Sequence, residues 1–110
     1  MPYGIPQDIE QRIRRRDKNC VYCHKAMIYP CVGDERYNWA TIEHFKENGP
    51  FYWAKGLKEE DLAICCFSCN SSRGNKGLLI WFKSKYCIDR NINEQTVAEP
   101  VKEYIRRIKK

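Results

Sequence analysis

Two short stretches of sequence decide the fold of this chain: Cys20-Val21-Tyr22-Cys23 and Cys66-Phe67-Ser68-Cys69-Asn70. Each contains two cysteines separated by two residues, a spacing at which one tight turn presents both sulfur atoms to the same metal ion. Two such pairs, brought together by folding, supply four thiolates in a tetrahedron, which is the usual closed site of a structural zinc ion. The sequence therefore predicts a structural zinc site with four ligands: Cys20, Cys23, Cys66 and Cys69.

Two neighbouring residues could compete for this zinc ion, Cys65 and His24. A pairing through Cys65 is conceivable because it lies beside Cys66, but the two-residue spacing to Cys69 favours Cys66. His24 directly follows the first pair, and we expect it on the surface of the turn. The cysteines left over are expected to be small buried apolar residues: Cys31, Cys65 and Cys87.

The composition describes one basic domain. The chain has 110 residues, seven cysteines, a formal net charge of +6 and a pI of about 9.0. The positive charge favours a polyanionic partner, most simply the phosphate backbone of DNA, although charge alone also fits a surface that is merely basic. We find no secretory signal and no run of transmembrane length, so we expect a cytoplasmic protein with no membrane partner, whose paired cysteines bind zinc rather than form disulfides. Nothing in the sequence indicates the oligomeric state.

Periodicity and turn residues predict a mixture of helices and short strands. Helices are expected at both ends and after the second cysteine pair: residues 7–18, residues from 71 onward, and residues 94–110. Strands are expected in three short apolar or aromatic runs: residues 26–29, 37–45 and 62–64. Asp8 is the expected cap of the first helix, and Pro100 suits the first turn of the last one.

The order of these parts resembles the zinc-bearing branch of the HNH endonuclease family. The resemblance covers residues 19–76: the first cysteine pair, then Glu43-His44, then the second pair followed directly by Asn70 and a basic-glycine step, Arg73-Gly74. It implies an α+β fold with a small ββα-metal core (the His-Me finger), in which two strands and a helix clasp one divalent cation. In this interpretation residues 1–110 form one HNH domain, stapled by the zinc site and flanked by the basic helices 7–18 and 94–110.

The resemblance also implies the roles of single residues in a metal-dependent DNA endonuclease. His44 is the general base, which takes a proton from the water that attacks phosphorus. Glu43, where the family more often has aspartate, and Asn70 hold magnesium or manganese through oxygen atoms, and Asn75 is the alternative to Asn70. Asp61 stands where the family has the asparagine that orients the base; an aspartate could orient an imidazole equally well, or it could signal a changed site.

Basic residues near the motif are candidates for contacts with DNA. The resemblance places Arg73 and Lys76 within reach of phosphate oxygens. The cluster Arg14, Arg15 and Arg16 fits a helix face that contacts phosphates and fits a solvated face equally well.

Two other functions remain open at this level. A zinc-ribbon-like nucleic-acid-binding module without catalysis explains the cysteines and the charge, and leaves Glu43-His44 incidental. A protein-interaction domain of the RING type needs eight ligands for two zinc ions, and this chain offers seven cysteines and two histidines at the wrong spacings.

Overall fold

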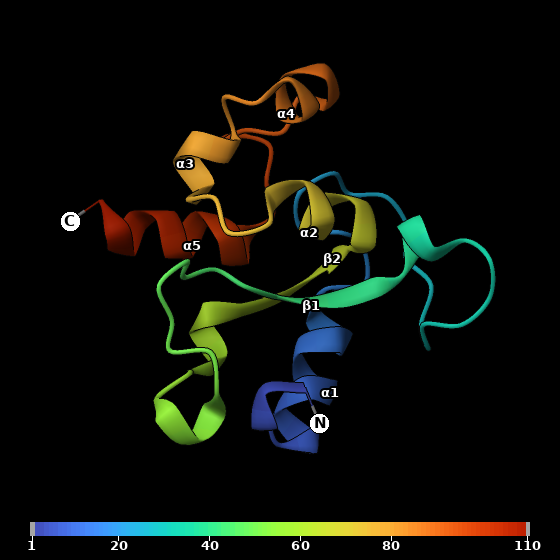
Figure 1. Cartoon of the computed structure of the whole chain (residues 1–110), viewed down its shortest axis with the longest axis vertical. Coiled ribbons are helices and arrows are strands. Elements are labelled where there is room, and N and C mark those ends of the chain that lie inside the picture. Colours follow the sequence, from blue (N-terminus) through green and yellow to red (C-terminus); the bar gives the residue numbers. More distant parts are fainter. Residues whose placement is uncertain (1, 110) are drawn as a thin grey trace.

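The computed structural model describes residues 2–109 and is built around a two-stranded antiparallel sheet (Figure 1). Strand β1 spans Ala40–His44 and strand β2 spans Leu62–Cys66. The register pairs Ala40 with Cys66, so the second cysteine pair begins where β2 ends. Successive side chains of a strand point to opposite faces, and the neighbours Glu43 and His44 therefore serve different sides of the sheet.

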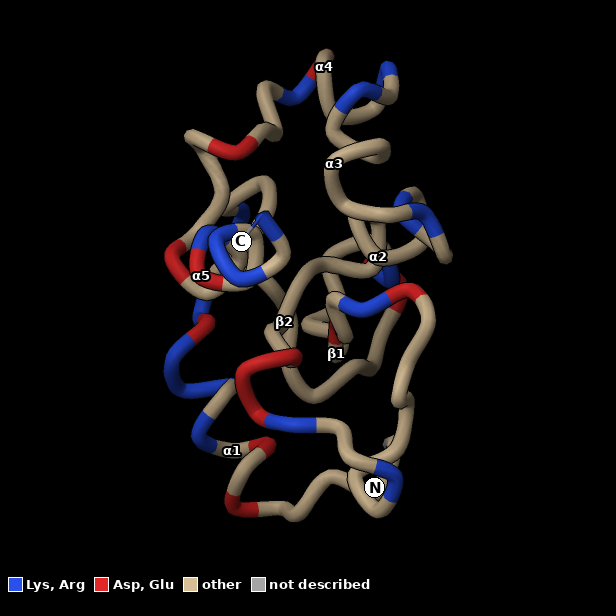
Figure 2. The backbone as a smooth tube through the Cα atoms, turned by 90° about the vertical axis from the view of Figure 1, so that its left-hand side faces the viewer, with Lys and Arg blue, Asp and Glu red and all other residues tan. Residues whose placement is uncertain are grey.

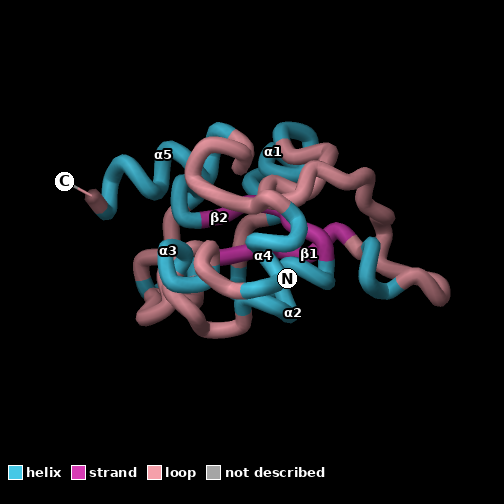
Figure 3. Tube along the Cα trace, turned by 90° about the horizontal axis from the view of Figure 1, so that it is seen from above, coloured by secondary structure: helices cyan, strands magenta, loops and turns pink. Residues whose placement is uncertain are grey.

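Helices surround this sheet. Residues 2–109 contain α1 (Gln7–Arg16), α2 (Phe67–Arg73), α3 (Leu78–Trp81), α4 (Lys85–Arg90) and α5 (Glu99–Ile108). Helices α1 and α2 contact the sheet, and Figures 1 and 3 show them on opposite sides of it. The radius of gyration is 13.3 Å, close to the value of about 13 Å for a compact chain of 100 residues. The predicted α+β class is confirmed.

The core has two halves, one on each side of β2, and all five residues of this strand are buried. Side chains from α3 and α5 fill the larger half, among them Trp81, Val101 and Ile105, together with Ala63 and Cys65 of β2. The smaller half lies beneath α1 and contains Ile5, Ile13, Leu57, Leu62 and Ile64. The alternation of β2 between the two halves follows from the two-residue period of a strand.

The predicted helices at both ends are confirmed, with different boundaries. Helix α1 ends at Arg16 rather than residue 18, because the carboxylate of Asp17 turns away to accept a hydrogen bond from the backbone amide of Ile64 at 3.0 Å. The prediction that Asp8 caps α1 is wrong: Pro6 precedes the first turn, and Asp8 lies within it. Helix α5 begins at Glu99 rather than residue 94, and the predicted end at Lys110 lies outside the described residues.

Two predictions for the middle of the chain are wrong. Residues 26–29 form only isolated bridges, Ala26 with Asn19 and Ile28 with Trp39, and no regular strand. The helix expected from Ser71 begins earlier, at Phe67, because the sulfur of Cys66 accepts a hydrogen bond from the amide of Cys69 and caps the first turn. It then ends at Arg73, before Gly74, whose φ of +54° suits a residue without a side chain.

Charge is mixed over the flanking helices. Figure 2 shows lysine and arginine interspersed with aspartate and glutamate on both α1 and α5. Within the part of the chain that the structure describes, no helix has the length and apolar character needed to cross a membrane.

Candidate metal centre and hydrolytic site

The four cysteines predicted to meet do meet. The sulfur atoms of Cys20, Cys23, Cys66 and Cys69 all lie within 4.8 Å of one another, and the structure contains no other such cluster of histidine, cysteine, aspartate or glutamate among residues 2–109. Three of the four are buried, and Cys23 is half-buried. Four sulfur ligands at this spacing suit a metal ion such as zinc.

The two cysteine pairs of the cluster come from different elements of the fold. The turn after α1 carries Cys20 and Cys23, while Cys66 ends β2 and Cys69 lies in the first turn of α2. Hydrogen bonds from Cys20 lower the pKa of the Cys66 thiol to about 7, and bonds from the same thiol hold the pKa of Cys23 well below its usual range. The cluster therefore contains two thiols that ionise readily.

The neighbours that could have competed stay off the cluster. The imidazole Nε2 of His24 hydrogen-bonds the carbonyl oxygen of Thr96, on the segment before α5. Cys65 points into the larger half of the core, where burial raises the pKa of its thiol well above the usual value. Cys87 is buried as expected, whereas Cys31 is half-buried, with its sulfur 3.4 Å from the carbonyl oxygen of Ala40.

Glu43 is held in a buried network on the α2 side of β1. Its side chain is only 4% exposed, and its Oε2 atom accepts hydrogen bonds from the hydroxyl of Tyr22 at 2.6 Å and from the guanidinium of Arg73 at 2.8 Å. Burial raises the pKa of Tyr22 well above its usual value, so the phenol stays a donor at neutral pH. The carboxylate is thus already charge-balanced within the protein.

Arg73 completes this network and is not a phosphate ligand. It is 2% exposed, and its remaining donors bind the carbonyl oxygens of His44, Phe45 and Lys76. The prediction that Arg73 contacts DNA is wrong, because the guanidinium ties α2 to the end of β1 instead. Lys76 is exposed, and its ammonium group lies 3.2 Å from the carbonyl oxygen of Ser72.

Asn70 lies on the same side of β1 as Glu43. Its amide nitrogen donates to the hydroxyl of Thr41 at 3.0 Å and to the carbonyl oxygen of Ile42 at 3.1 Å. Within residues 2–109 its side-chain oxygen, like Oε1 of Glu43, receives no hydrogen bond. A carboxylate oxygen and an amide oxygen are ligands that a hard cation takes, so these atoms fit magnesium or manganese in chemical type, while the nearby charge of Arg73 weakens the expected binding.

His44 lies on the opposite face, at the end of β1. Its ring makes T-shaped contacts with two aromatic rings, and its centroid lies 5.2 Å from that of Tyr3 and 4.9 Å from that of Phe51. Its Nδ1 atom is buried and has no hydrogen-bond partner in the described chain. The imidazole is therefore held by packing alone.

The predicted role of Asp61 in orienting His44 is wrong. Asp61 is 1% exposed, and its Oδ2 atom accepts a hydrogen bond from the amide of Lys58 and lies 3.8 Å from the ammonium of Lys46. Its Oδ1 atom lies 3.6 Å from the guanidinium of Arg107. The carboxylate holds α5 and the adjoining loops rather than the imidazole.

The arginine cluster of α1 is divided between structural and exposed positions. Arg14 binds Glu10 and the carbonyl oxygen of Ala40, both at 2.9 Å, and Arg16 binds Asp17 and the carbonyl oxygen of Leu62. These two side chains connect α1 to the sheet. Arg14 is only 13% exposed and already paired with Glu10, which makes it a poor phosphate ligand, whereas Arg16 is exposed and its contact with phosphate stays a prediction. Arg15 is exposed, and it remains a candidate.

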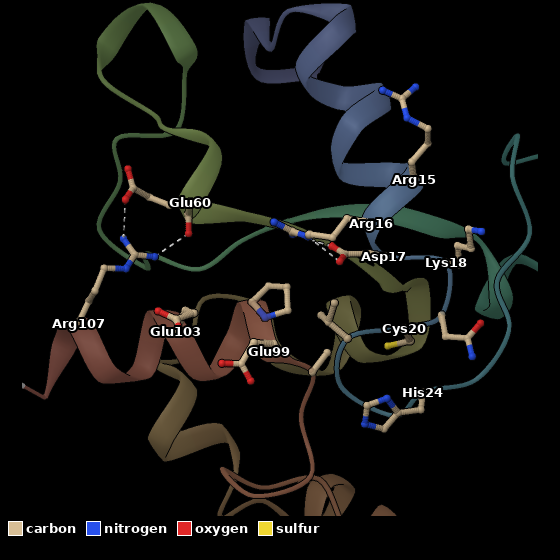
Figure 4. Close-up of a pocket in the computed structure, with 14 residues that line it drawn as sticks. Arg15, Arg16, Asp17, Lys18, Cys20, His24, Glu60, Glu99, Glu103 and Arg107 are labelled. Carbon is tan, nitrogen blue, oxygen red and sulfur yellow. Dashed lines mark hydrogen bonds and ion pairs between the residues drawn. The ribbon is translucent and has the colours of Figure 1, made fainter.

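A groove of about 820 Å³ lies between the end of α1, the first cysteine turn and α5 (Figure 4). Figure 4 shows Arg15, Arg16 and Lys18 along one side, and Glu99 and Glu103 of α5 along the other. Arg107 donates to the carbonyl oxygen of Glu60 at one end. Because carboxylates line it as well as cations, the groove is a poor track for a phosphate backbone.

Sequence reasoning missed the aromatic residues that hold the site. From the sequence, Tyr22 and Tyr3 are indistinguishable from ordinary core residues, because their partners Glu43 and His44 lie far along the chain. The hydroxyl of Tyr86 lies 3.3 Å from the sulfur of Cys69 and is a direct neighbour of the cysteine cluster. Only the position of Tyr22 inside the first cysteine pair was a signal that could have drawn attention to it.

Comparison of the chain with protein-family models, with curated proteins and with solved structures finds no match.

Proposed function

We propose that this protein is a metal-dependent DNA endonuclease of the HNH type, with His44 as the general base. One observation supports it most: β1 carries Glu43 and His44 next to each other, and α2, which starts at the second cysteine pair, places Asn70 on the Glu43 face of that strand, with its amide nitrogen 3.1 Å from the carbonyl oxygen of Ile42. The order and type of these residues are those that the resemblance to the family implies. The net charge of +6 suits a DNA partner.

His44 has one chemical task in this proposal, which is to remove a proton from the attacking water. A neutral imidazole near pH 7 accepts a proton from water as the oxygen attacks phosphorus, and the 3′-oxygen leaves. The aromatic rings of Tyr3 and Phe51 limit rotation of the imidazole, which positions it for that transfer. Glu43 and Asn70 would hold a magnesium or manganese ion, which when bound would neutralise the charge on the phosphate and on the leaving 3′-oxygen.

The cysteine cluster serves a structural role in this proposal. Four sulfur ligands leave no open position for water or substrate, so a zinc ion there would not take part in hydrolysis. It would fix α2 against the first cysteine turn, and thereby the position of Asn70 against β1.

The ion pair of Glu43 with Arg73 favours a second candidate, a zinc-stapled DNA-binding module without catalysis. A buried guanidinium already balances the carboxylate that would hold the catalytic ion. In this alternative the guanidinium of Arg73 occupies the place of a metal cation beside Glu43, and His44 only packs against its aromatic neighbours.

Cleavage of supercoiled plasmid DNA by the zinc-loaded protein, with magnesium or manganese, separates the two candidates. The hydrolase nicks or linearises the plasmid only with the added cation, and His44→Ala abolishes cleavage while DNA affinity stays the same. His24→Ala is the matched control, because it removes the other histidine from an exposed turn. Intact plasmid in both metals, with DNA still bound, would establish the binding module, and cleavage that survives in His44→Ala would refute His44 as the base.

A further inference from the structure

A second pocket lies beside the cysteine cluster, away from His44. It has a volume of about 470 Å³ and is lined by Cys23, Lys25, Tyr37, Ser68, Tyr86 and Arg90. These residues come from the first cysteine turn, the 3-10 turn at Arg36–Asn38, the start of α2 and helix α4. No carboxylate lines it, in contrast to the groove of Figure 4.

Cations and aromatic rings alternate in this pocket. The ammonium of Lys25 lies 5.5 Å from the ring centre of Tyr37, and the guanidinium of Arg90 lies 3.7 Å from that of Tyr86. Within residues 2–109 neither cation takes part in an ion pair. Tyr37 is 54% exposed, so much of its ring is open to solvent.

The same pattern continues along the projecting loop that precedes β1. Within this loop the guanidinium of Arg36 lies 5.6 Å from the ring centre of Trp39, and Tyr29, over which the ion-paired Arg14 of α1 lies, is also largely exposed. Figures 1 and 3 show this loop extending away from the body of the molecule. Exposed rings next to cations are the features with which proteins bind single-stranded nucleic acid, since each base has a face to stack and each phosphate a charge to neutralise.

We propose that this pocket binds one nucleotide of a single-stranded DNA segment, with the base stacked on Tyr37 and the phosphate between Lys25 and Arg90. The inference rests on the proposed function only in taking DNA as the partner. With zinc bound, four thiolates would leave the centre a net charge of −2, and Cys23 of that centre lines the pocket, so the centre repels a phosphate there. The pocket therefore requires the base as well as the phosphate, and inorganic phosphate alone binds weakly.

Fluorescence anisotropy of a labelled oligothymidylate tests this site. The full-length, zinc-loaded protein is used without magnesium or manganese, so that no cleavage occurs. Tyr37→Ala and Arg90→Ala are each expected to weaken binding about tenfold, the usual loss for one stacked base or its cation. Both side chains are exposed, and the zinc content of each variant verifies that its fold is intact.

Matched variants make the result specific. Lys85→Ala removes a cation from the same helix but outside the pocket, and Tyr52→Ala removes an exposed tyrosine elsewhere; both are expected to bind as the wild type does. Thymidine 5′-monophosphate should compete with the oligonucleotide at concentrations where inorganic phosphate does not. Wild-type affinity in both pocket variants, or equal competition by polyglutamate, would overturn the proposal.

The plasmid assay keeps this inference separate from the proposed function. Weakened binding in Tyr37→Ala, with no plasmid cleavage by the wild type, would keep the pocket and remove the hydrolase. Plasmid cleavage with unchanged binding in both pocket variants would keep the hydrolase and remove the pocket.

Discussion

The guanidinium of Arg73 donates to Oε2 of Glu43 at 2.8 Å, and both side chains are almost completely buried. The pair joins α2 to β1 at the end of the sheet where His44 also lies. Breaking a buried pair by removing one partner is costly, because the remaining charge is left in a medium that solvates it poorly. Glu43 and Arg73 are therefore a structural pair first, whatever chemistry the site performs.

Arg73→Met tests this structural role. The methionine keeps much of the side-chain volume but leaves the Glu43 carboxylate with Tyr22 as its one remaining donor among the described residues. We expect a loss of about 3–5 kcal/mol in the free energy of unfolding. Urea denaturation of the zinc-loaded protein measures it.

Lys76→Met is the matched control for that variant, because it removes an exposed cation three residues further along. It is expected to leave the urea midpoint nearly unchanged. Adding Glu43→Gln to Arg73→Met should recover part of the lost stability, since no unpaired charge then stays buried. A double variant that is less stable than the sum of the two single losses would contradict the buried ion pair.

The contrast between Arg73 and the cysteines explains what could be foreseen from the sequence. The spacing of the cysteine pairs is a local property, and it was enough to identify the ligands that meet. The partner of Arg73 lies thirty residues away, in a strand whose register with β2 no local pattern specifies. For this reason the local sequence predicts a surface cation at Arg73, where the structure has a buried arginine that ties two elements together.

The same distinction holds for the elements. The amphipathic pattern of α5 and the apolar run of β2 are visible in the residues themselves, and both elements form. The division of the expected long helix into α2, α3 and α4 depends on the cap made by the Cys66 sulfur and on the φ of Gly74. Both are effects of single residues at the ends of α2, which the spacing of apolar residues along a helix does not indicate.

The choice of Cys66 over Cys65 as a metal ligand is testable with two neighbouring substitutions. Cys66→Ala removes one of the four clustered sulfur atoms, whereas Cys65→Ala removes a thiol from the apolar core. We expect Cys65→Ala to retain about one zinc ion per chain and Cys66→Ala to lose it and unfold. Zinc analysis of the purified proteins and far-ultraviolet circular dichroism measure both effects. Retention of zinc by Cys66→Ala, or two zinc ions in the wild type, would contradict a single four-cysteine site.

Metal binding at this cluster should depend strongly on pH. Zinc binds thiolates, so each thiol that is protonated in the free protein must lose its proton. The pKa of Cys66 is lowered to about 7, chiefly by the hydrogen bond from Cys20, while the neighbouring thiols raise the pKa values of Cys20 and Cys69. Protons therefore compete with zinc over the whole range below the raised pKa values, and below about 7 they compete at Cys66 too.

We accordingly expect the apparent zinc affinity to fall as the pH is lowered, and to fall more steeply once Cys66 also becomes protonated. Competition with a chromophoric chelator at a series of pH values measures this slope. The same titration on Cys87→Ala is the control, because Cys87 lies outside the cluster. An affinity that does not change between neutral and acidic pH would mean that thiolates are not the ligands.

Asp61→Asn separates a structural role of this carboxylate from a catalytic one. Asp61 contacts Lys58, Lys46 and Arg107, and it makes no hydrogen bond to His44. We expect a loss of about 1–3 kcal/mol in the free energy of unfolding, because the buried carboxylate loses the charge that its cationic neighbours stabilise.

At a temperature where the Asp61→Asn variant is fully folded, plasmid cleavage should stay close to the wild-type rate. Glu60→Gln is the control. The carboxylate of Glu60 is next to Asp61 in the sequence and also lies near Arg107, but it is more exposed than that of Asp61. A fall in cleavage of about a hundredfold or more in folded Asp61→Asn is the size expected when a general base loses the residue that orients it. That result would contradict a purely structural role for Asp61.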